Sequence, residues 1–145
     1  LEVAKSAANR GSYPNPGRPY YLWPTLPGNE LTLTSSVTDS LSPFQLALWY
    51  WIEMELRFSR IQQQHPSVQP IEIDLAELND HERVEQLFAQ LGIQHKSLST
   101  RVDTHKGAKP SVISSDDRNA ARYLLSRLPN NILADISNTY ELQCL

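Results

Sequence analysis

The sequence predicts an α/β fold in which a long helix, one short strand and a second helix follow one another between Ser42 and Leu91. Three observations predict it: a long apolar run with helical spacing, a short segment in which apolar and acidic residues alternate, and a second run with helical spacing. Apolar residues spaced by three and four share one face of a helix, whereas alternating residues share one face of a strand. We therefore expect a mostly helical α/β chain with one clear strand, at 71–75, and a long proline-rich loop.

The long helix is predicted to begin at Pro43 and to end at His65. Ser42 is a good N-cap, and proline is tolerated at the first helical position because its missing N–H is not needed there. The residue before Pro66 avoids helical conformation, which ends the helix. We expect burial over much of its surface because two apolar rows run along it. The rows are Phe44, Ala47, Leu48, Trp51, Met54, Phe58 and Ile61, and Leu46, Trp49, Ile52 and Leu56.

The predicted strand raises a problem of backbone pairing. Its N–H and C=O groups need partners in a neighbouring strand, and we find no second convincing strand in the sequence. Either the strand is wrongly assigned or its neighbours lie outside these residues, and we expect the chain to be the C-terminal part of a larger α/β domain. The second helix follows Asn79, which forms a predicted capping box with Glu82, and it ends at Gly92. Its apolar stripe consists of Val84, Leu87, Phe88 and Leu91.

The remaining segments are shorter or irregular. Residues 1–10 are expected to end a helix that stops at Gly11. Residues 11–41 hold five prolines and four aromatic residues, and proline at this density excludes both a helix and a central strand. A loop of this kind either covers a substrate or packs its aromatic residues on the body as a structural arm. A third helix is predicted from Ser115 to Pro129, with a short last turn after it.

Composition limits the class of protein. Hydrophobic residues make up 40% and charged residues 20% of the 145, which is ordinary for a globular domain. A net charge of -3 without a basic run gives no reason to expect nucleic acid as a partner. No apolar run reaches about 18 residues, so we expect no membrane-spanning helix. One cysteine, Cys144, excludes an internal disulfide framework and fits a reducing compartment, which favours a cytoplasmic location.

Few residues point to chemistry by spacing alone. The four histidines show no metal-ligand spacing, so we expect no metal. Glu53 precedes Arg57 by four residues, the favourable order for an ion pair on a helix. Glu53 or Glu55 is alternatively a buried catalytic carboxylate, but an ion pair that orients neighbouring segments is the preferred interpretation. The basic loop 101–109 is either an anion site built around Gly107 or a solvated polar turn, and spacing alone favours the turn.

Three stretches together resemble the C-terminal half of sulfotransferases, enzymes that use 3′-phosphoadenosine 5′-phosphosulfate. The stretches are Leu1 to Ser6 followed by Arg10, residues 44–50 followed by Glu53, Glu55 and Arg57, and residues 71–92, which end in Leu91-Gly92. The resemblance implies a P-loop-type three-layer α/β domain, of which residues 1–145 are the C-terminal part, with the P-loop half absent. It also implies transfer of a sulfuryl group to a hydroxyl or amine of a small-molecule or glycan acceptor.

The same resemblance implies roles for individual residues. Ser6 would bind the 3′-phosphate of the cofactor, and Lys106 with Gly107 would close over that phosphate, although His105 stands where the family has arginine. Arg101 would take the place of that arginine. The loop that contains Tyr20, Tyr21 and Trp23 would shape the acceptor site. No catalytic base is assigned, the phosphosulfate-binding lysine is missing, and we expect no sulfuryl transfer by this chain alone.

Two other functions are compatible with the sequence. One is a non-catalytic helical interaction module in which Trp49, Trp51 and Phe58 dock a partner. The other is a degenerate member of the sulfotransferase family that keeps the fold without the chemistry.

Overall fold

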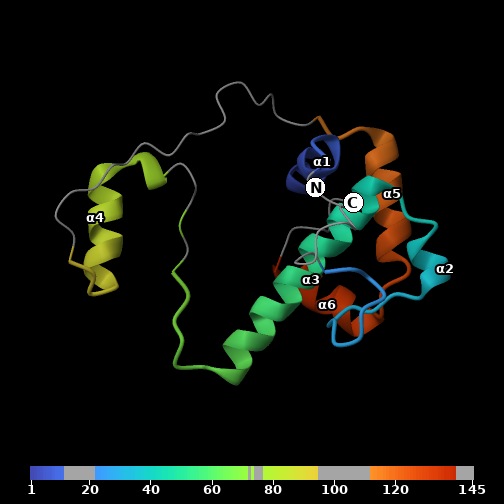
Figure 1. Ribbon diagram of the computed structural model, residues 1–145. Coiled ribbons are helices and arrows are strands. Elements are labelled where there is room, and N and C mark those ends of the chain that lie inside the picture. The colour runs from blue at the N-terminus through green and yellow to red at the C-terminus, as the bar shows by residue number, and fades with distance from the viewer. Residues whose placement is uncertain (12–21, 72, 74–76, 95–111, 140–145) are drawn as a thin grey trace. The chain divides into compact units, whose positions relative to one another are not determined.

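The computed structural model describes residues 1–11, 22–71, 73, 77–94 and 112–139 (Figure 1). Every regular element in these ranges is helical. The elements are α1 (Glu2–Asn9), α2 (Ser35–Thr38), α3 (Pro43–Gln64), the 3₁₀ turn η1 (Glu77–Asn79), α4 (His81–Gln90), α5 (Ser115–Leu125) and α6 (Asn130–Thr139). The chain divides into two compact units, the first formed by Leu1–Pro66 with Pro110–Leu145 and the second by Ser67–Lys109.

The predicted α/β fold is wrong for the part of the chain that the structure describes. Ile71 and Ile73 are not in a strand, and no strand occurs within the ranges given above; positions 72, 74 and 75 lie outside them. Alternation specifies a strand only where one face is covered and a ladder is available. Ile71 is 41% exposed, so its side chain lacks the apolar cover that the pattern presupposes.

Helix α3 has the predicted boundaries. The Ser42 hydroxyl accepts a hydrogen bond from the Gln45 N–H at 3.3 Å, and the Gln45 Oε1 accepts one from the Ser42 N–H at 2.9 Å. This reciprocal pair is a capping box, which satisfies two backbone donors at the start of the helix. His65 is the C-cap, directly before Pro66.

The core of the first unit forms where α1 and α5 pack on α3 (Figure 1). Trp49 and Ile52 of α3 are fully buried there, beside Leu124 of α5. The Gln45 Nε2 also donates to the Ala120 carbonyl at 2.8 Å and thereby ties α3 to α5. The other buried apolar residues of this core are Ala4, Leu31, Leu33, Leu41, Phe44, Leu46, Ala47, Leu48, Ala121, Leu128 and Ile132.

An ion pair joins α1 to the start of α5. Lys5 Nζ lies 2.5 Å from Asp117 Oδ1, and the Ser114 hydroxyl donates to Asp117 Oδ2 at 2.7 Å. Ser114, rather than the predicted Ser115, is the N-cap, because Asp117 then stands at the third helical position and completes a capping box. Helix α1 ends as expected before Gly11, whose φ of 60° is accessible at little cost to glycine alone.

The second unit contains η1 and α4 among its described residues. Asp80, one residue after the predicted cap, accepts hydrogen bonds from the N–H groups of Glu82 and Arg83 at 3.0 and 3.3 Å. Gly92 follows the helix with a φ of 66°, as predicted. Val84 is the one hydrophobic residue in the described part of this unit that is buried.

Candidate functional site

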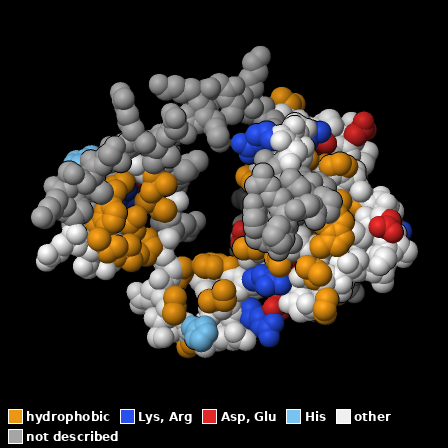
Figure 2. Space-filling model, in the orientation of Figure 1, with side chains coloured by type: hydrophobic (Ala, Val, Ile, Leu, Met, Phe, Trp, Pro, Cys, Tyr) orange, Lys and Arg blue, Asp and Glu red, His pale blue; other side chains and the backbone are white. Residues whose placement is uncertain are grey.

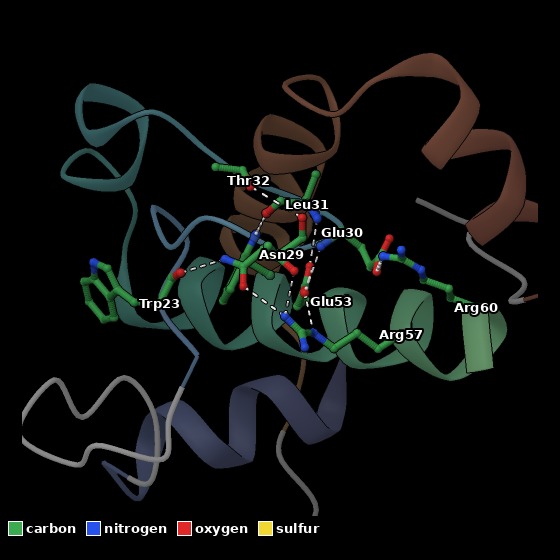
Figure 3. Close-up of polar contacts among 10 residues, drawn as sticks. Trp23, Asn29, Glu30, Leu31, Thr32, Glu53, Arg57 and Arg60 are labelled. Atoms are coloured by element: carbon green, nitrogen blue, oxygen red, sulfur yellow. Dashed lines mark hydrogen bonds and ion pairs between the residues drawn. The ribbon is translucent and has the colours of Figure 1, made fainter. Parts of the chain in front are cut away.

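The clearest polar centre in the first unit is the carboxylate of Glu53, in the middle of α3 (Figure 3). Its side chain is fully buried. The N–H of Glu30 donates to Oε1 at 3.0 Å, and the N–H of Leu31 donates to Oε2 at 2.8 Å. The carboxylate therefore holds residues 23–33, which we call the arm, against the helix.

Arg57 completes this centre from one turn further along α3. Its Nε lies 2.6 Å from Glu53 Oε1, so the ion pair predicted from the four-residue spacing is confirmed. The same guanidinium donates through Nη2 to the Gly28 carbonyl at 3.3 Å and to Asn29 Oδ1 at 3.2 Å. One more turn along, Arg60 pairs with Glu30. Two arginines of α3 thus bind the same tight bend of the arm.

The arm is also held by bonds that do not involve Glu53. Asn29 Nδ2 donates to the Trp23 carbonyl at 2.8 Å, and the Leu33 N–H donates to the Pro24 carbonyl at 2.8 Å. The indole Nε1 of Trp49 donates to the Leu31 carbonyl at 2.9 Å (Figure 3 shows the arm crossing α3). Of the two interpretations of the proline-rich segment, these bonds support the structural arm for residues 23–33.

This arrangement makes Glu53 an anchor and gives it no freedom to act as a base. Both carboxylate oxygens accept hydrogen bonds from the arm, and Oε1 also pairs with Arg57. Every buried side-chain nitrogen or oxygen in the described residues has a hydrogen-bond partner. The same residues contain no cluster of three or more histidine, cysteine or acidic side chains that could hold a metal ion. The orienting ion pair, the preferred interpretation of Glu53, is the one that the structure contains.

The residues predicted to bind the cofactor are mostly outside the described ranges. Arg101, Lys106 and Gly107 lie there, as do Tyr20 and Tyr21 of the predicted acceptor loop. Two of the named site residues can be placed. Ser6 lies in α1, where its carbonyl accepts a hydrogen bond from Arg10 Nε at 3.2 Å, and Trp23 is half-buried at the start of the arm.

A second feature of α3 is an apolar row on its surface. Met54, Phe58 and Ile61, which we call the distal row, are 44%, 48% and 49% exposed. At about 100° per residue, Phe58 lies about 180° around the helix from Trp49, the centre of the buried face. Figure 2 shows hydrophobic and basic side chains next to one another over this half of α3. The spacing predicted one continuous row from Phe44 to Ile61, but burial covers only its first part.

Helix α1 accounts for the difference between the two parts of the row. It packs on α3, and Lys5 Nζ lies 5.8 Å from the centre of the Phe44 ring. Phe44 and Ala47, which precede the distal row on the same face, are buried. Trp51 is half-buried at the border. The distal row thus continues an existing helix–helix interface beyond the point at which it is covered.

The structure corrects the residues proposed for an interaction module. Trp49 is fully buried and its indole N–H is used within the chain, so it does not dock a partner. Phe58 is exposed as that hypothesis requires, and Met54 and Ile61 join it. The sequence pattern placed Met54 and Ile61 on the same face of the helix as Phe58 but did not predict that they are exposed.

Comparisons with known proteins give no relative for this chain. No family model, curated protein or solved structure matches it. Within the described residues, no helix has the length and apolar character needed to cross a membrane.

Proposed function

We propose that this chain is a helical protein-interaction module whose distal row binds a helical segment of a polypeptide partner. The observation that carries the proposal is the exposure of three large apolar side chains in one row on a helix whose opposite face buries Trp49, Ile52 and Glu53. Single exposed apolar residues are ordinary, but a contiguous group is typical of a binding surface.

The spacing of the row favours a helix as the bound segment. Residues separated by four and then three positions form a narrow ridge along one side of a helix. Ridges of this kind pack into the grooves of a second helix. Helix α1 already packs on the preceding part of the same face, so a helix laid on the distal row extends a type of contact that this surface makes elsewhere.

The polar centre at Glu53 supports binding by holding the distal half of α3 in place. Arg57 and Arg60 lie on the same half of α3 as Met54, Phe58 and Ile61, and both are paired with carboxylates. A surface that is ordered before binding loses less conformational entropy when a partner arrives. The arm therefore acts as a brace for the binding surface.

Sulfuryl transfer by a longer parent protein stays a prediction of the resemblance alone. It has lost the support of the expected strand at 71–75. Ser6 and Trp23, the two predicted site residues that the structure describes, add no support for a nucleotide site.

The proposal is tested with a designed probe peptide. The probe is a fluorescein-labelled peptide of three heptads, with leucine at the two core positions and alternating glutamate and lysine elsewhere. We expect it to bind the wild-type chain and to bind Phe58→Asp at least about tenfold more weakly, a difference of about 1.4 kcal/mol, because a carboxylate in an apolar contact must be desolvated. Fluorescence anisotropy gives both affinities.

Matched variants distinguish binding by the distal row from non-specific hydrophobic binding. Val3→Asp changes an exposed apolar residue of α1 in the same way and should leave binding within about twofold. Ile61→Asp should weaken binding as Phe58→Asp does. Equal binding by wild type, Phe58→Asp and Ile61→Asp would contradict the proposal, and so would equally strong binding of a probe with two prolines that prevent helix formation.

A further inference from the structure

We propose that Met54 is an oxidative modification site, at which conversion of its thioether to a sulfoxide weakens the binding of a helical partner to the distal row. The proposal rests on the function proposed above and names a way in which that surface is regulated. Three observations carry it: Met54 is the one methionine of the chain, its side chain is exposed, and it lies within the apolar row rather than in the core.

Met54 is accessible to a dissolved oxidant. Its side chain is 44% exposed, whereas Leu48, Trp49 and Ile52 on the same helix are at most 2% exposed. Oxidation of a methionine requires that the oxidant reach the sulfur, so exposure decides which positions react. Helix α3 therefore presents its one thioether on a part of its surface that the packing of the first unit leaves open.

The reaction is a two-electron oxidation by a peroxide. A lone pair on Met54 Sδ attacks one oxygen of hydrogen peroxide, so that an S–O bond forms and the O–O bond breaks. The proton on the transferred oxygen passes to the departing hydroxide, which leaves as water. The sulfur is thereby oxidised and the peroxide reduced. A methionine sulfoxide reductase reverses the change with two thiols, which become a disulfide while the oxygen leaves as water.

The position of Met54 within the row makes a sulfoxide unfavourable for binding. Met54 follows Trp51 by three residues and precedes Phe58 by four, so apolar residues flank it along the row. The sulfoxide oxygen accepts hydrogen bonds from water in the free chain. An apolar ridge of a partner helix offers no donor in exchange, so binding would remove this hydration without replacing it.

The same change leaves the core of the first unit intact. Met54 follows Trp49 by five residues, which places it about 140° around α3 from the centre of the buried face. Polar substitutions at exposed positions usually alter stability little. The oxidised chain should therefore unfold within about 3 °C of the reduced chain in a thermal scan, which distinguishes loss of binding from loss of folding.

The rate of oxidation tests accessibility. The full chain in a Cys144→Ser background is treated with dilute hydrogen peroxide, and mass spectrometry follows the addition of one oxygen atom to the peptide that contains residue 54. We expect a rate within about threefold of that of N-acetylmethionine amide. The control combines Met54→Leu with Leu48→Met, a well-tolerated exchange that moves the methionine to a buried position of α3. It should react at least about tenfold more slowly.

Fluorescence anisotropy with the designed probe then tests the effect on binding. After the peroxide is removed, the oxidised chain should bind the probe at least about fivefold more weakly than the reduced chain. Treatment with a methionine sulfoxide reductase and dithiothreitol should restore the affinity. A Met54→Leu chain treated in the same way controls for damage elsewhere: whatever its own affinity, the ratio of its values before and after peroxide should be about one.

The outcomes distinguish this inference from the function on which it rests. Oxidation as slow as in the buried control overturns the inference, and so does equal binding of the probe by the oxidised and reduced chains. A loss of affinity that Met54→Leu shows to the same extent also overturns it, because the damage then lies elsewhere. In each of these cases, a probe that binds the untreated chain and is weakened by Phe58→Asp leaves the proposed function standing. If the untreated chain does not bind the probe, both fall.

Discussion

At the scale of single residues, Glu53 shows how a charge can be kept within an apolar helix. Removing a carboxylate from water is costly unless hydrogen bonds and an opposite charge replace the lost hydration. The backbone N–H groups of Glu30 and Leu31, together with Arg57, provide this replacement. Arg57 was predictable from its spacing, but the two N–H donors were not, because no side-chain pattern marks a backbone donor more than twenty residues away.

Glu53→Gln should destabilise the first unit by about 3 kcal/mol. The substitution leaves Arg57 without its anion and turns an amide N–H₂ toward an N–H of the arm, so that a buried donor loses its acceptor. Urea unfolding measures the loss. Amide hydrogen exchange at Glu30 and Leu31 should become faster than elsewhere in the unit.

Arg60→Gln is the matched control for this prediction. It removes the Arg60–Glu30 ion pair, which is exposed to solvent, and exposed pairs contribute little. Its loss of stability should be much smaller than that of Glu53→Gln. Equal losses in the two variants would show that burial of Glu53 has no special importance.

At the scale of elements, helix boundaries were more predictable than burial. Ser42, Pro43 and Pro66 define α3 by local geometry, and the structure agrees. The exposure of Phe58 depends on which part of α3 the neighbouring elements cover, a tertiary fact that periodicity does not contain. The strand predicted at 71–75 was wrong for the same reason. Alternating apolar residues indicate that a strand would have an apolar face, but they do not show that a neighbouring element covers that face.

The link between α1 and α5 predicts a dependence of stability on pH. The Lys5 ammonium and the Ser114 hydroxyl and N–H hold the pKa of Asp117 at about 2, below its usual 3.8. Since the pKa is lower in the folded than in the unfolded chain, ionised Asp117 stabilises the fold above about pH 5, and this contribution is lost as pH falls toward 2. The stability difference between wild type and Asp117→Asn should shrink over that range in thermal unfolding.

Asp116→Asn provides the comparison within the same helical turn. Asp116 is exposed and shares with Asp117 the favourable position near the positive end of α5. Its substitution should cost less stability at neutral pH than Asp117→Asn, because Asp117 also forms the pair with Lys5. An equal loss in the two variants would assign the effect to the helix end rather than to the Lys5 pair.

At the scale of the whole molecule, the described residues of the two units differ in how many apolar side chains they bury. The first unit buries apolar residues from α1, the arm, α3, α5 and α6, whereas the described part of the second buries Val84. Residues 67–109 are close to the size of about 40 residues below which a domain usually needs a disulfide, a metal or oligomerisation to fold. The sequence expectation that 1–145 belong to one domain remains a prediction.

A synthetic peptide covering residues 67–109 should therefore be mostly unfolded in water. A helix of ten residues is marginal in isolation, even with the side-chain cap that Asp80 provides. Far-UV circular dichroism should show weak helicity without a cooperative thermal transition. A sharp transition in the isolated peptide would show that this unit has a core of its own.

The packing of the arm has an optical consequence. All three indoles of the chain, at Trp23, Trp49 and Trp51, belong either to the arm or to the helix that it crosses, and residues 67–109 contain neither tryptophan nor tyrosine. Intrinsic emission of the intact protein is therefore a local reporter of arm detachment. This emission does not change when α4 melts, because the second unit contains no tryptophan or tyrosine. Detachment of the arm and melting of α4 can therefore be followed separately in one sample.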